Sequence, residues 1–278
     1  MKHFESHNND SIVTINDTDR CVYLKHKLSL KNIPIYPARR TSSTTTYLYA
    51  GDGITYSIGN FTDRNAVVAT LYIPILDRQD DESYVYAMSS NMPMKEVTIE
   101  ETRNRNHPDR IGKWTNYARV IFVTDSVDNV RKIADSMELY VFSNKIPKTD
   151  NYGMEIYGQD GNVVFNSNLL IMRLASIIRK EYPSTFLSKA AYEIGKVKFK
   201  DIKKAGLCVT QPLAFITSNN NGYMKQTVKW DGDGVDIVTD YRGNSGGAVR
   251  SNSVNTTQVL ICELDGTQNI PAVQKMVI

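Results

Sequence analysis

Short apolar runs separated by polar turns recur along most of this 278-residue chain. Between residues 47 and 88 there are four such runs, rich in Val, Ile, Tyr and Thr: YLYAG, GITYSIG, AVVATLYIPIL and SYVYAM. These residue types favour half-buried strands, and the Gly, Asp and Asn residues between the runs favour turns. The pattern therefore predicts a meander of neighbouring strands. The polar stretch 94–110 is expected to be a long loop, and ARVIFVTD after it a buried strand.

The segment 126–138 has a different periodicity. Its apolar residues recur at spacings of three and four: Val127, Val130, Ile133, Ala134 and Met137. This spacing places them on one face of a helix, and either Asp125 or Ser126 could cap the first turn. We expect one amphipathic helix here, packed on the sheet and followed by a strand over ELYVFSN.

The second half of the chain opens with a hairpin pattern, YGMEIYGQDGNVVFNSN. Asp160 and Gly161 at its centre suit a turn with positive φ. The run LLIMRLASII is expected to be a buried strand, and residues 184–206 fit either a short helix opened by Ser184 or, over VKFKDI, a strand. Further strands are predicted over PLAFITS, QTVKWDG, GVDIVTD and TQVLICELDG. Short strands at this spacing are typical of a small antiparallel β-sandwich.

Together these patterns predict a mainly β protein with three parts. Residues 1–46 include two prolines and a Ser/Thr cluster that interrupt regular elements, and are expected to form an extended arm or linker. Residues 47–150 are expected to form a β-rich domain that carries the helix 126–138. A polar, proline-containing segment at 146–150 marks the expected boundary. Residues 151–278 are expected to form the C-terminal β-sandwich.

Charge and composition narrow the function. With 33 basic and 30 acidic side chains the net charge is +3, and no basic stripe is interleaved with aromatic residues, so we expect no nucleic-acid binding. No window approaches 18 apolar residues and the first residues lack the apolar core of a signal peptide, so we expect neither membrane insertion nor secretion by that route. Cys21, Cys208 and Cys262 form no C-x-x-C pair and are expected to be reduced structural thiols.

Metal and cofactor motifs are missing from the sequence. No histidine stands at metal-ligand spacing from a cysteine or carboxylate, and there is no G-x-x-x-x-G-K phosphate loop. The Asp-Gly runs at 51–53 and 231–234 lack the later glutamate of a calcium loop, so we interpret both as turns. We therefore expect no metal and no cofactor.

One stretch matches a catalytic motif. In YRGNSGGAV, Ser245 stands among glycines as the nucleophile does in many chymotrypsin-like proteases. His107, Asp150 and Ser245 follow the chymotrypsin order, which leaves a serine endopeptidase as an alternative function. However, His107 lies in the charged stretch RNRNHPDR and Asp150 in a polar linker, where few apolar neighbours could shelter them. We interpret residues 243–247 as a turn between two strands, with no base for the serine, and expect no catalytic residues.

Several segments of the second half form a recognisable series. They are a Tyr-Gly start and first strand at 152–157, a turn at 160–162, a second strand ending in Asn-Ser at 163–167, and a strand with an arginine at 172–174, followed by 212–218, 228–238 and 259–264. Over about residues 152–266 this series resembles a family of tailed-bacteriophage virion proteins. The resemblance implies a structural part of a tail, tail tip or fibre attachment. It supplies no catalytic residue, and it places the glycine-rich segment in the loop before the closing strand.

From this resemblance we expect a non-enzymatic structural component of a bacteriophage virion, tail- or fibre-associated, made in the host bacterial cytoplasm and located in the virion. Its expected partners are other virion proteins (tail, fibre or collar subunits), further copies of itself in a homo-oligomer and, at a fibre tip, a host surface receptor. An arm with interspersed apolar residues suits addition to the sheet edge of a neighbour.

Aromatic residues leave two questions open. The following tyrosines fit either contacts between subunits or the packing of their own sheets: Tyr47, Tyr49, Tyr84, Tyr86 and Tyr152. Trp114 and Trp230 could stack on sugars, which makes a carbohydrate- or receptor-binding module a further alternative, or they could belong to the core.

Overall fold

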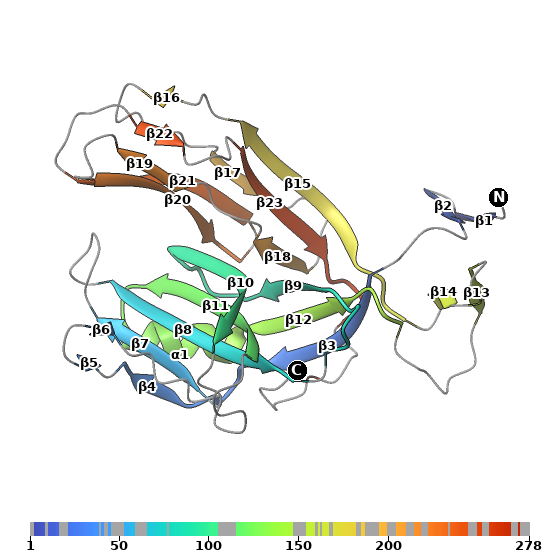
Figure 1. Cartoon of the computed structure of the whole chain (residues 1–278), viewed down its shortest axis with the longest axis horizontal. Helices are drawn as coiled ribbons and strands as arrows, with labels where there is room; N and C mark the ends of the chain where they lie inside the picture. Colours follow the sequence, from blue (N-terminus) through green and yellow to red (C-terminus); the bar gives the residue numbers. More distant parts are fainter. Residues whose placement is uncertain are drawn as a thin grey trace.

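The computed structural model confirms a mainly β protein with several sheets (Figure 1). It describes residues 3–8, 11–16, 22–38, 40–41, 44–45, 53–58, 66–76, 78–104, 115–146, 154–158, 161, 163–166, 169–181, 185–186, 195–198, 204–209, 214–217, 222–232, 234–243, 249–251, 256–267 and 272. This part of the chain contains 23 strands and one α-helix.

A five-stranded sheet forms the lower-left layer of Figure 1. Its strands lie in the order β10 (Glu96–Asn104), β11 (Thr115–Thr124), β8 (Val67–Ile75), β7 (Ile54–Ile58) and β4 (Ile35–Pro37). Neighbouring strands are antiparallel except β4 and β7, which are parallel. Their buried Val, Leu, Ile and Phe side chains make one wall of the core.

Helix α1 (Val127–Ser136) packs on β8 and β11 of this sheet. Ser126 is the N-cap, and its hydroxyl accepts a hydrogen bond from the amide of Asn129 at 3.2 Å. This bond satisfies one of the free amides of the first turn. The prediction of a helix over 126–138 is confirmed, with Ser126 rather than Asp125 as the cap.

A six-stranded antiparallel sheet runs through the middle of the molecule. Its strands lie in the order β15 (Arg173–Glu181), β23 (Thr256–Glu263), β18 (Ala205–Val209), β9 (Tyr84–Ser89), β12 (Glu138–Ser143) and β3 (Tyr23–Ser29). Strands from before and after the expected boundary at 146–150 therefore share one sheet, joined where Leu207 of β18 pairs with Met88 of β9. The division into separate domains at that point stays a prediction.

A second six-stranded antiparallel sheet occupies the upper left of Figure 1. Its strands lie in the order β16 (Thr185–Phe186), β22 (Val249–Ser251), β19 (Ala214–Thr217), β20 (Gly222–Trp230), β21 (Gly234–Gly243) and β17 (Gly195–Lys198). Gly232 has φ +81° between β20 and β21, and the Asp231 amide donates to the Gly234 carbonyl. The interpretation of 231–234 as a turn is confirmed.

Three two-stranded hairpins complete the described structure. They are β1 (His3–Asn8) with β2 (Ser11–Asn16), β5 (Arg40–Thr41) with β6 (Thr44–Thr45), and β13 (Glu155–Tyr157) with β14 (Val163–Asn166). In the last of these Gly161 has φ +77°. The predicted hairpin, with a turn that needs positive φ, is confirmed.

The three larger sheets and α1 enclose one continuous hydrophobic core. Two backbone hydrogen bonds join the segment before β10 to the end of β20. The Met94 amide donates to the Trp230 carbonyl at 2.8 Å, and the Trp230 amide donates to the Met94 carbonyl at 3.0 Å. A smaller cluster on the outer face of the middle sheet includes Tyr140, Cys208 and Cys262.

Two expectations about the first half are corrected. The polar stretch from residue 94 is not a loop throughout, because Val97 and Ile99 are buried against the core and draw β10 into the five-stranded sheet. The meander is also broken, because β9 leaves β7 and β8 and pairs with β12 in the middle sheet.

Two further expectations fail because of where the strands lie in the middle sheet. Strand β3 falls inside the expected arm, yet it pairs along β12, and Tyr23 and Leu28 are buried. Strand β15 was expected to be buried, but it lies at the end of the sheet, where Leu174 and Ile177 are exposed.

Candidate functional site

The residues of the alternative protease site are not placed by the structure. His107, Asp150 and Ser245 all lie outside the described residues, as does Trp114. Trp230 is described and is 1% exposed, and its Nε1 donates a hydrogen bond to the Ser90 carbonyl at 2.7 Å. Because the indole is enclosed, it offers no face to a sugar, and the interpretation of Trp230 as a core residue is confirmed.

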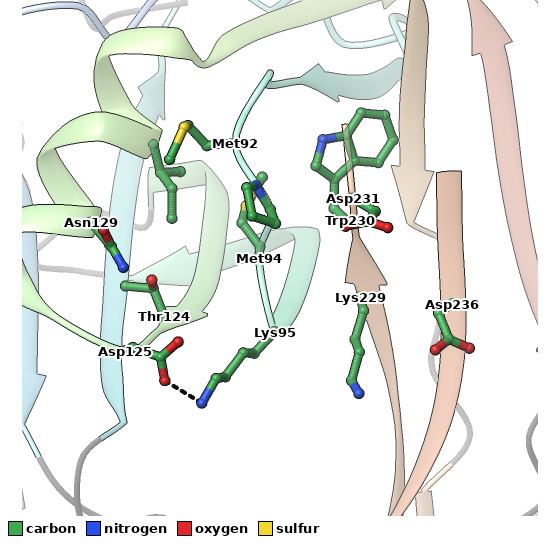
Figure 2. A pocket seen from close by; sticks show the side chains of 12 residues that line it. Met92, Met94, Lys95, Thr124, Asp125, Asn129, Lys229, Trp230, Asp231 and Asp236 are labelled. Carbon is green, nitrogen blue, oxygen red and sulfur yellow. Dashed lines mark ion pairs between the residues drawn. The ribbon is translucent and has the colours of Figure 1, made fainter. Parts of the chain in front are cut away.

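A cavity of about 280 Å³ lies beside Trp230, between α1 and the strands β20 and β21 (Figure 2). Met92 and Met94 line it, and Lys95 and Asp125 form an ion pair there. Its side chains form no set that could coordinate a metal, since no group of three His, Cys, Asp or Glu residues suited to that role occurs in the described part of the chain. We interpret the cavity as a gap in the packing between layers.

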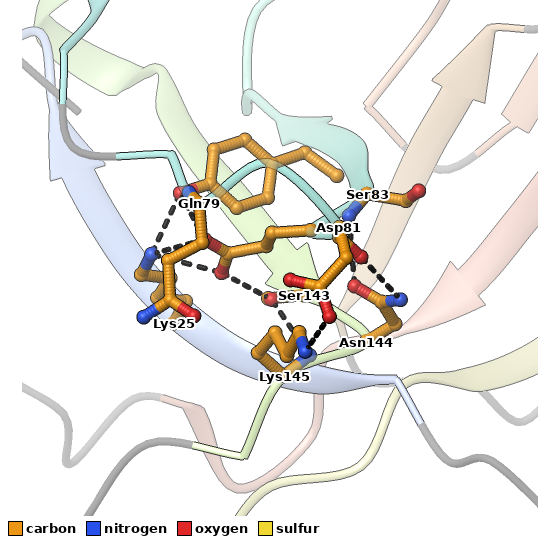
Figure 3. A network of polar contacts seen from close by, with 9 residues as sticks. Lys25, Gln79, Asp81, Ser83, Ser143, Asn144 and Lys145 are labelled. Carbon is orange, nitrogen blue, oxygen red and sulfur yellow. Dashed lines mark hydrogen bonds and ion pairs between the residues drawn. The ribbon is translucent and has the colours of Figure 1, made fainter.

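A buried carboxylate, Glu82, is bound by Lys25, Gln79 and Ser143 of the polar network in Figure 3. It accepts hydrogen bonds from Lys25 Nζ at 2.8 Å, from Ser143 Oγ at 2.5 Å and from the Gln79 amide at 3.2 Å. Burial alone would raise the pKa of Glu82, but these hydrogen bonds outweigh it and the pKa is lowered. With its side chain only 1% exposed, this carboxylate ties the segment before β9 to β3 and β12 and is closed to a substrate.

A second network surrounds Glu138 at the start of β12. Lys204 and Lys27 both form ion pairs with it, the latter at 3.2 Å, and the Tyr140 hydroxyl donates to it at 2.5 Å. Burial opposes ionisation of Glu138, yet these partners lower its pKa. Lys27 Nζ also donates to the Thr267 carbonyl at 3.1 Å. This network holds the turn after β23 against the middle sheet and is structural.

Two of the three cysteines are described, and both are buried free thiols. The pKa of Cys208 is raised by its hydrogen bond with Cys262 and by burial. A thiol with a raised pKa is a weak nucleophile, so these two cysteines match the expectation of reduced structural thiols. Cys21 lies outside the described residues.

The surface offers a clearer candidate than the interior. Six large hydrophobic residues are exposed in the described structure: Tyr36, Ile58, Met154, Tyr157, Leu174 and Ile177. Four of these six fall within residues 154–177, on the hairpin β13–β14 and on the first half of β15. Clustered exposed apolar residues mark interaction sites more often than isolated ones do.

This region is anchored to the rest of the molecule just before β15. The Leu24 amide donates to the Leu170 carbonyl and the Met172 amide donates to the Val22 carbonyl, each at 2.8 Å. The segment that leads from β14 to β15 is thereby fastened to the start of β3. The hairpins β1–β2 and β13–β14 both extend away from the sheets on this side of the molecule (Figure 1).

The hairpin β13–β14 has an ordered polar face. The two oxygens of Glu155 accept hydrogen bonds from Tyr157 OH at 2.6 Å and from Asn166 Nδ2 at 2.9 Å. The hydrogen bond to Glu155 raises the pKa of Tyr157. Among the described strands, β13 and β14 pair only with each other. A lone two-stranded hairpin is only marginally stable in water.

Strand β15 presents a second apolar surface. Leu174 pairs with Cys262, and Ile177 pairs with Leu260 two residues away on β23. A bulge at Ala175 makes this possible, so Leu174 and Ile177 lie on the same face although they are three residues apart. They are 53% and 55% exposed. Arg173 is also exposed, but it pairs with Glu263, and as the neighbour of Leu174 in the strand it points to the opposite face of the sheet. Sequence reasoning missed this surface because it expected a buried strand. The charged Arg173 within the apolar run was the one indication that the strand is partly exposed.

We name these residues the corner surface and divide it into two halves. The hairpin half is Met154, Glu155 and Tyr157, and the strand half is Leu174 and Ile177.

The five candidate tyrosines were expected to serve either contacts between subunits or the packing of their own sheets, and the structure describes two of them. Tyr84 and Tyr86 pack against the core, and their hydroxyls contact Lys25 and Glu101, so these two serve their own sheets. The three others, Tyr47, Tyr49 and Tyr152, lie outside the described residues.

Comparisons with known proteins add no relative. No family model matches the chain, and no curated protein or solved structure matches it. The resemblance over residues 152–266 therefore stays a prediction. Among the described residues, no helix has the length and apolar character needed to span a membrane.

Proposed function

We propose that this chain is a structural component of a bacteriophage virion, tail- or fibre-associated, which acts through protein–protein contacts at the corner surface rather than through catalysis. Its partners are other virion proteins and further copies of itself. If the protein lies at a fibre tip, the same surface would bind a receptor on the host.

The observation that carries the proposal is the grouping of exposed apolar residues at the corner. Four of the six exposed large hydrophobic residues lie there, two at the hairpin β13–β14 and two on β15, and the hairpin pairs with no other described strand. The hairpin is also the segment on which the family resemblance begins. Interfaces are enriched in aromatic residues and Met, and the hairpin half of the corner surface contains Tyr157 and Met154, both exposed.

Particle morphology tests the assembly role. The coding sequence would be deleted from the genome that carries it, and the particles examined by negative-stain electron microscopy. Particles without tails or fibres support assembly, and complete particles that fail to adsorb to cells support receptor binding. Complete particles that infect normally would contradict both.

The serine endopeptidase remains the second candidate because of the Gly-Asn-Ser-Gly-Gly match at Ser245. Incubation of the purified chain with a fluorophosphonate probe separates it from the structural role. Our proposal expects no labelling. Labelling of Ser245 that is abolished by His107→Ala would establish a nucleophile with its base and would refute a purely structural role.

A further inference from the structure

The hairpin half of the corner surface carries a carboxylate whose charge is not compensated by the described residues. Glu155 is exposed, and no described lysine or arginine forms an ion pair with it. Other glutamates of the described structure do have such partners: Glu82, Glu100, Glu101 and Glu138. Glu155 therefore presents a negative charge to whatever approaches the hairpin.

The side chains around Glu155 hold its carboxylate in one orientation. Its Oε2 accepts a hydrogen bond from Tyr157 OH at 2.6 Å, and its Oε1 accepts one from Asn166 Nδ2 at 2.9 Å. Asn166 is 1% exposed, so this end of the arrangement is fixed within the hairpin. These contacts place the three side chains on one face of β13–β14. Each carboxylate oxygen accepts one of the two hydrogen bonds and keeps a lone pair for another donor.

The groups that remain free match a guanidinium. Two lone pairs on one planar carboxylate suit the two parallel N–H groups of an arginine side chain. Tyr157 is 57% exposed and lies beside the same carboxylate, and aromatic rings stack on guanidinium groups. A lysine ammonium lacks the planar pair of donors, and an uncharged saccharide would leave the negative charge uncompensated. Arginine therefore fits this face best.

We propose that the hairpin half of the corner surface binds an exposed arginine of another virion protein, whose guanidinium pairs with the carboxylate of Glu155 and stacks on the ring of Tyr157. This inference rests on the proposed function, and it names the chemistry of the partner at that site. The hydrogen bond to Glu155 raises the pKa of Tyr157 above its ordinary value of 10. The phenol therefore stays protonated at neutral pH and continues to orient the carboxylate.

Titration with a small arginine probe tests the contact directly. N-acetyl-arginine amide, added to the full chain labelled with ¹³C-tyrosine, should shift the NMR signal of Tyr157, which Tyr157→Phe assigns. N-acetyl-citrulline amide has nearly the same shape without the charge and should cause no shift. Glu155→Gln should weaken binding of the arginine probe by about 10-fold or more. Asp80→Asn, which neutralises an exposed carboxylate of another segment, should leave it unchanged.

Three results of this titration would overturn the arginine contact. They are equal shifts with the citrulline and arginine probes, equal binding of the arginine probe by Glu155→Gln and the wild type, and a Tyr157 shift with methyl α-glucoside but none with the arginine probe. The last result would assign the face to a saccharide.

Particles separate this inference from the proposed function. Glu155→Arg places like charges together at the contact, so particles that carry it should lose the chain, whereas Asp80→Arg particles should retain it. Circular dichroism of the purified variants would establish that both fold. If deletion of the whole chain gives incomplete particles but Glu155→Arg particles retain the chain, the proposed function survives and the arginine contact is wrong. If deletion gives complete, infectious particles, the proposed function itself fails.

Discussion

The two edge strands of the middle sheet expose different chemistry. At one edge, β3 carries Lys25 and Lys27, which are held by ion pairs to Glu82 at 2.8 Å and Glu138 at 3.2 Å. At the other edge, β15 leaves Leu174 and Ile177 in solvent. Charged residues that point inward at an edge discourage the docking of other chains, whereas exposed apolar residues invite it. Within the described residues, ion pairs therefore hold the β3 edge, whereas the β15 edge leaves two large apolar side chains exposed.

Removing the carboxylate at the β3 edge should have the largest effect on stability. Glu82→Ala leaves Lys25, Ser143 and the Gln79 amide without their acceptor, so the free energy of unfolding should fall by about 4 kcal/mol. Urea denaturation would measure it. The control is Glu101→Ala, which removes the exposed ion pair with Arg78 and the exposed hydrogen bond from the Tyr86 hydroxyl, and should cost less than about 1 kcal/mol. Equal losses in the two variants would show that the buried Glu82 contributes no more to the free energy of unfolding than an exposed carboxylate does.

Two neighbouring isoleucines test the exposed face of β15. Ile178 is 9% exposed and belongs to the core, whereas Ile177 is 55% exposed. Ile178→Ala should lower the free energy of unfolding by about 2–3 kcal/mol, and Ile177→Ala should change it by less than about 0.5 kcal/mol. Urea denaturation of the monomer, with unchanged m-values, is the measurement. A large loss for Ile177→Ala would mean that its side chain is covered within the chain.

Acid should weaken the β3 edge in particular. The folded-state pKa of Glu82 lies below the reference value of 4.5, and burial is overcome by hydrogen bonds from Lys25, Ser143 and Gln79. The stability that comes from ionised Glu82 is therefore fully present above pH 4.5 and is lost as the pH falls through the lower folded value. Urea midpoints measured from neutral pH down to pH 3 should fall less steeply in Glu82→Gln than in the wild type. Parallel curves would contradict this.

The smallest effect concerns the polar face of the hairpin. The hydrogen bond to Glu155 raises the pKa of Tyr157, so Glu155→Gln should bring that pKa back toward 10 while the fold is retained. Titration of ¹³C-labelled tyrosine by NMR would follow the phenol directly, with Tyr157→Phe to assign its signal. No change in the Tyr157 titration would mean that the two side chains are not joined in solution, and the orientation of Glu155 for a partner would lose its support.

Local patterns predicted the elements that depend on near neighbours. Helix α1 follows from three- and four-residue spacing with Ser126 as its cap, and the hairpin β13–β14 follows from alternation on both sides of Gly161. In these elements the hydrogen bonds and the buried face are set by residues a few positions apart. Such elements can be recognised before any tertiary contact is known.

Elements that depend on distant residues were missed. Strand β10 is rich in charge, and only the packing of Val97 and Ile99 against the core makes it a strand of the sheet. Glu82 gave no signal as a buried residue, because its partners Lys25 and Ser143 are 57 and 61 positions away.

The amino-acid sequence by itself determined that this protein is mainly β and that residues 126–138 contain a helix, because the apolar periodicity of each segment depends only on that segment. Tertiary structure alone decided which strands are neighbours, which carboxylates are enclosed and which edge of the middle sheet carries exposed apolar residues. The physical reason is that burial is a property of the assembled sheets: a run such as LLIMRLASII is equally apolar at a centre and at an edge, and only its neighbours decide what water can reach.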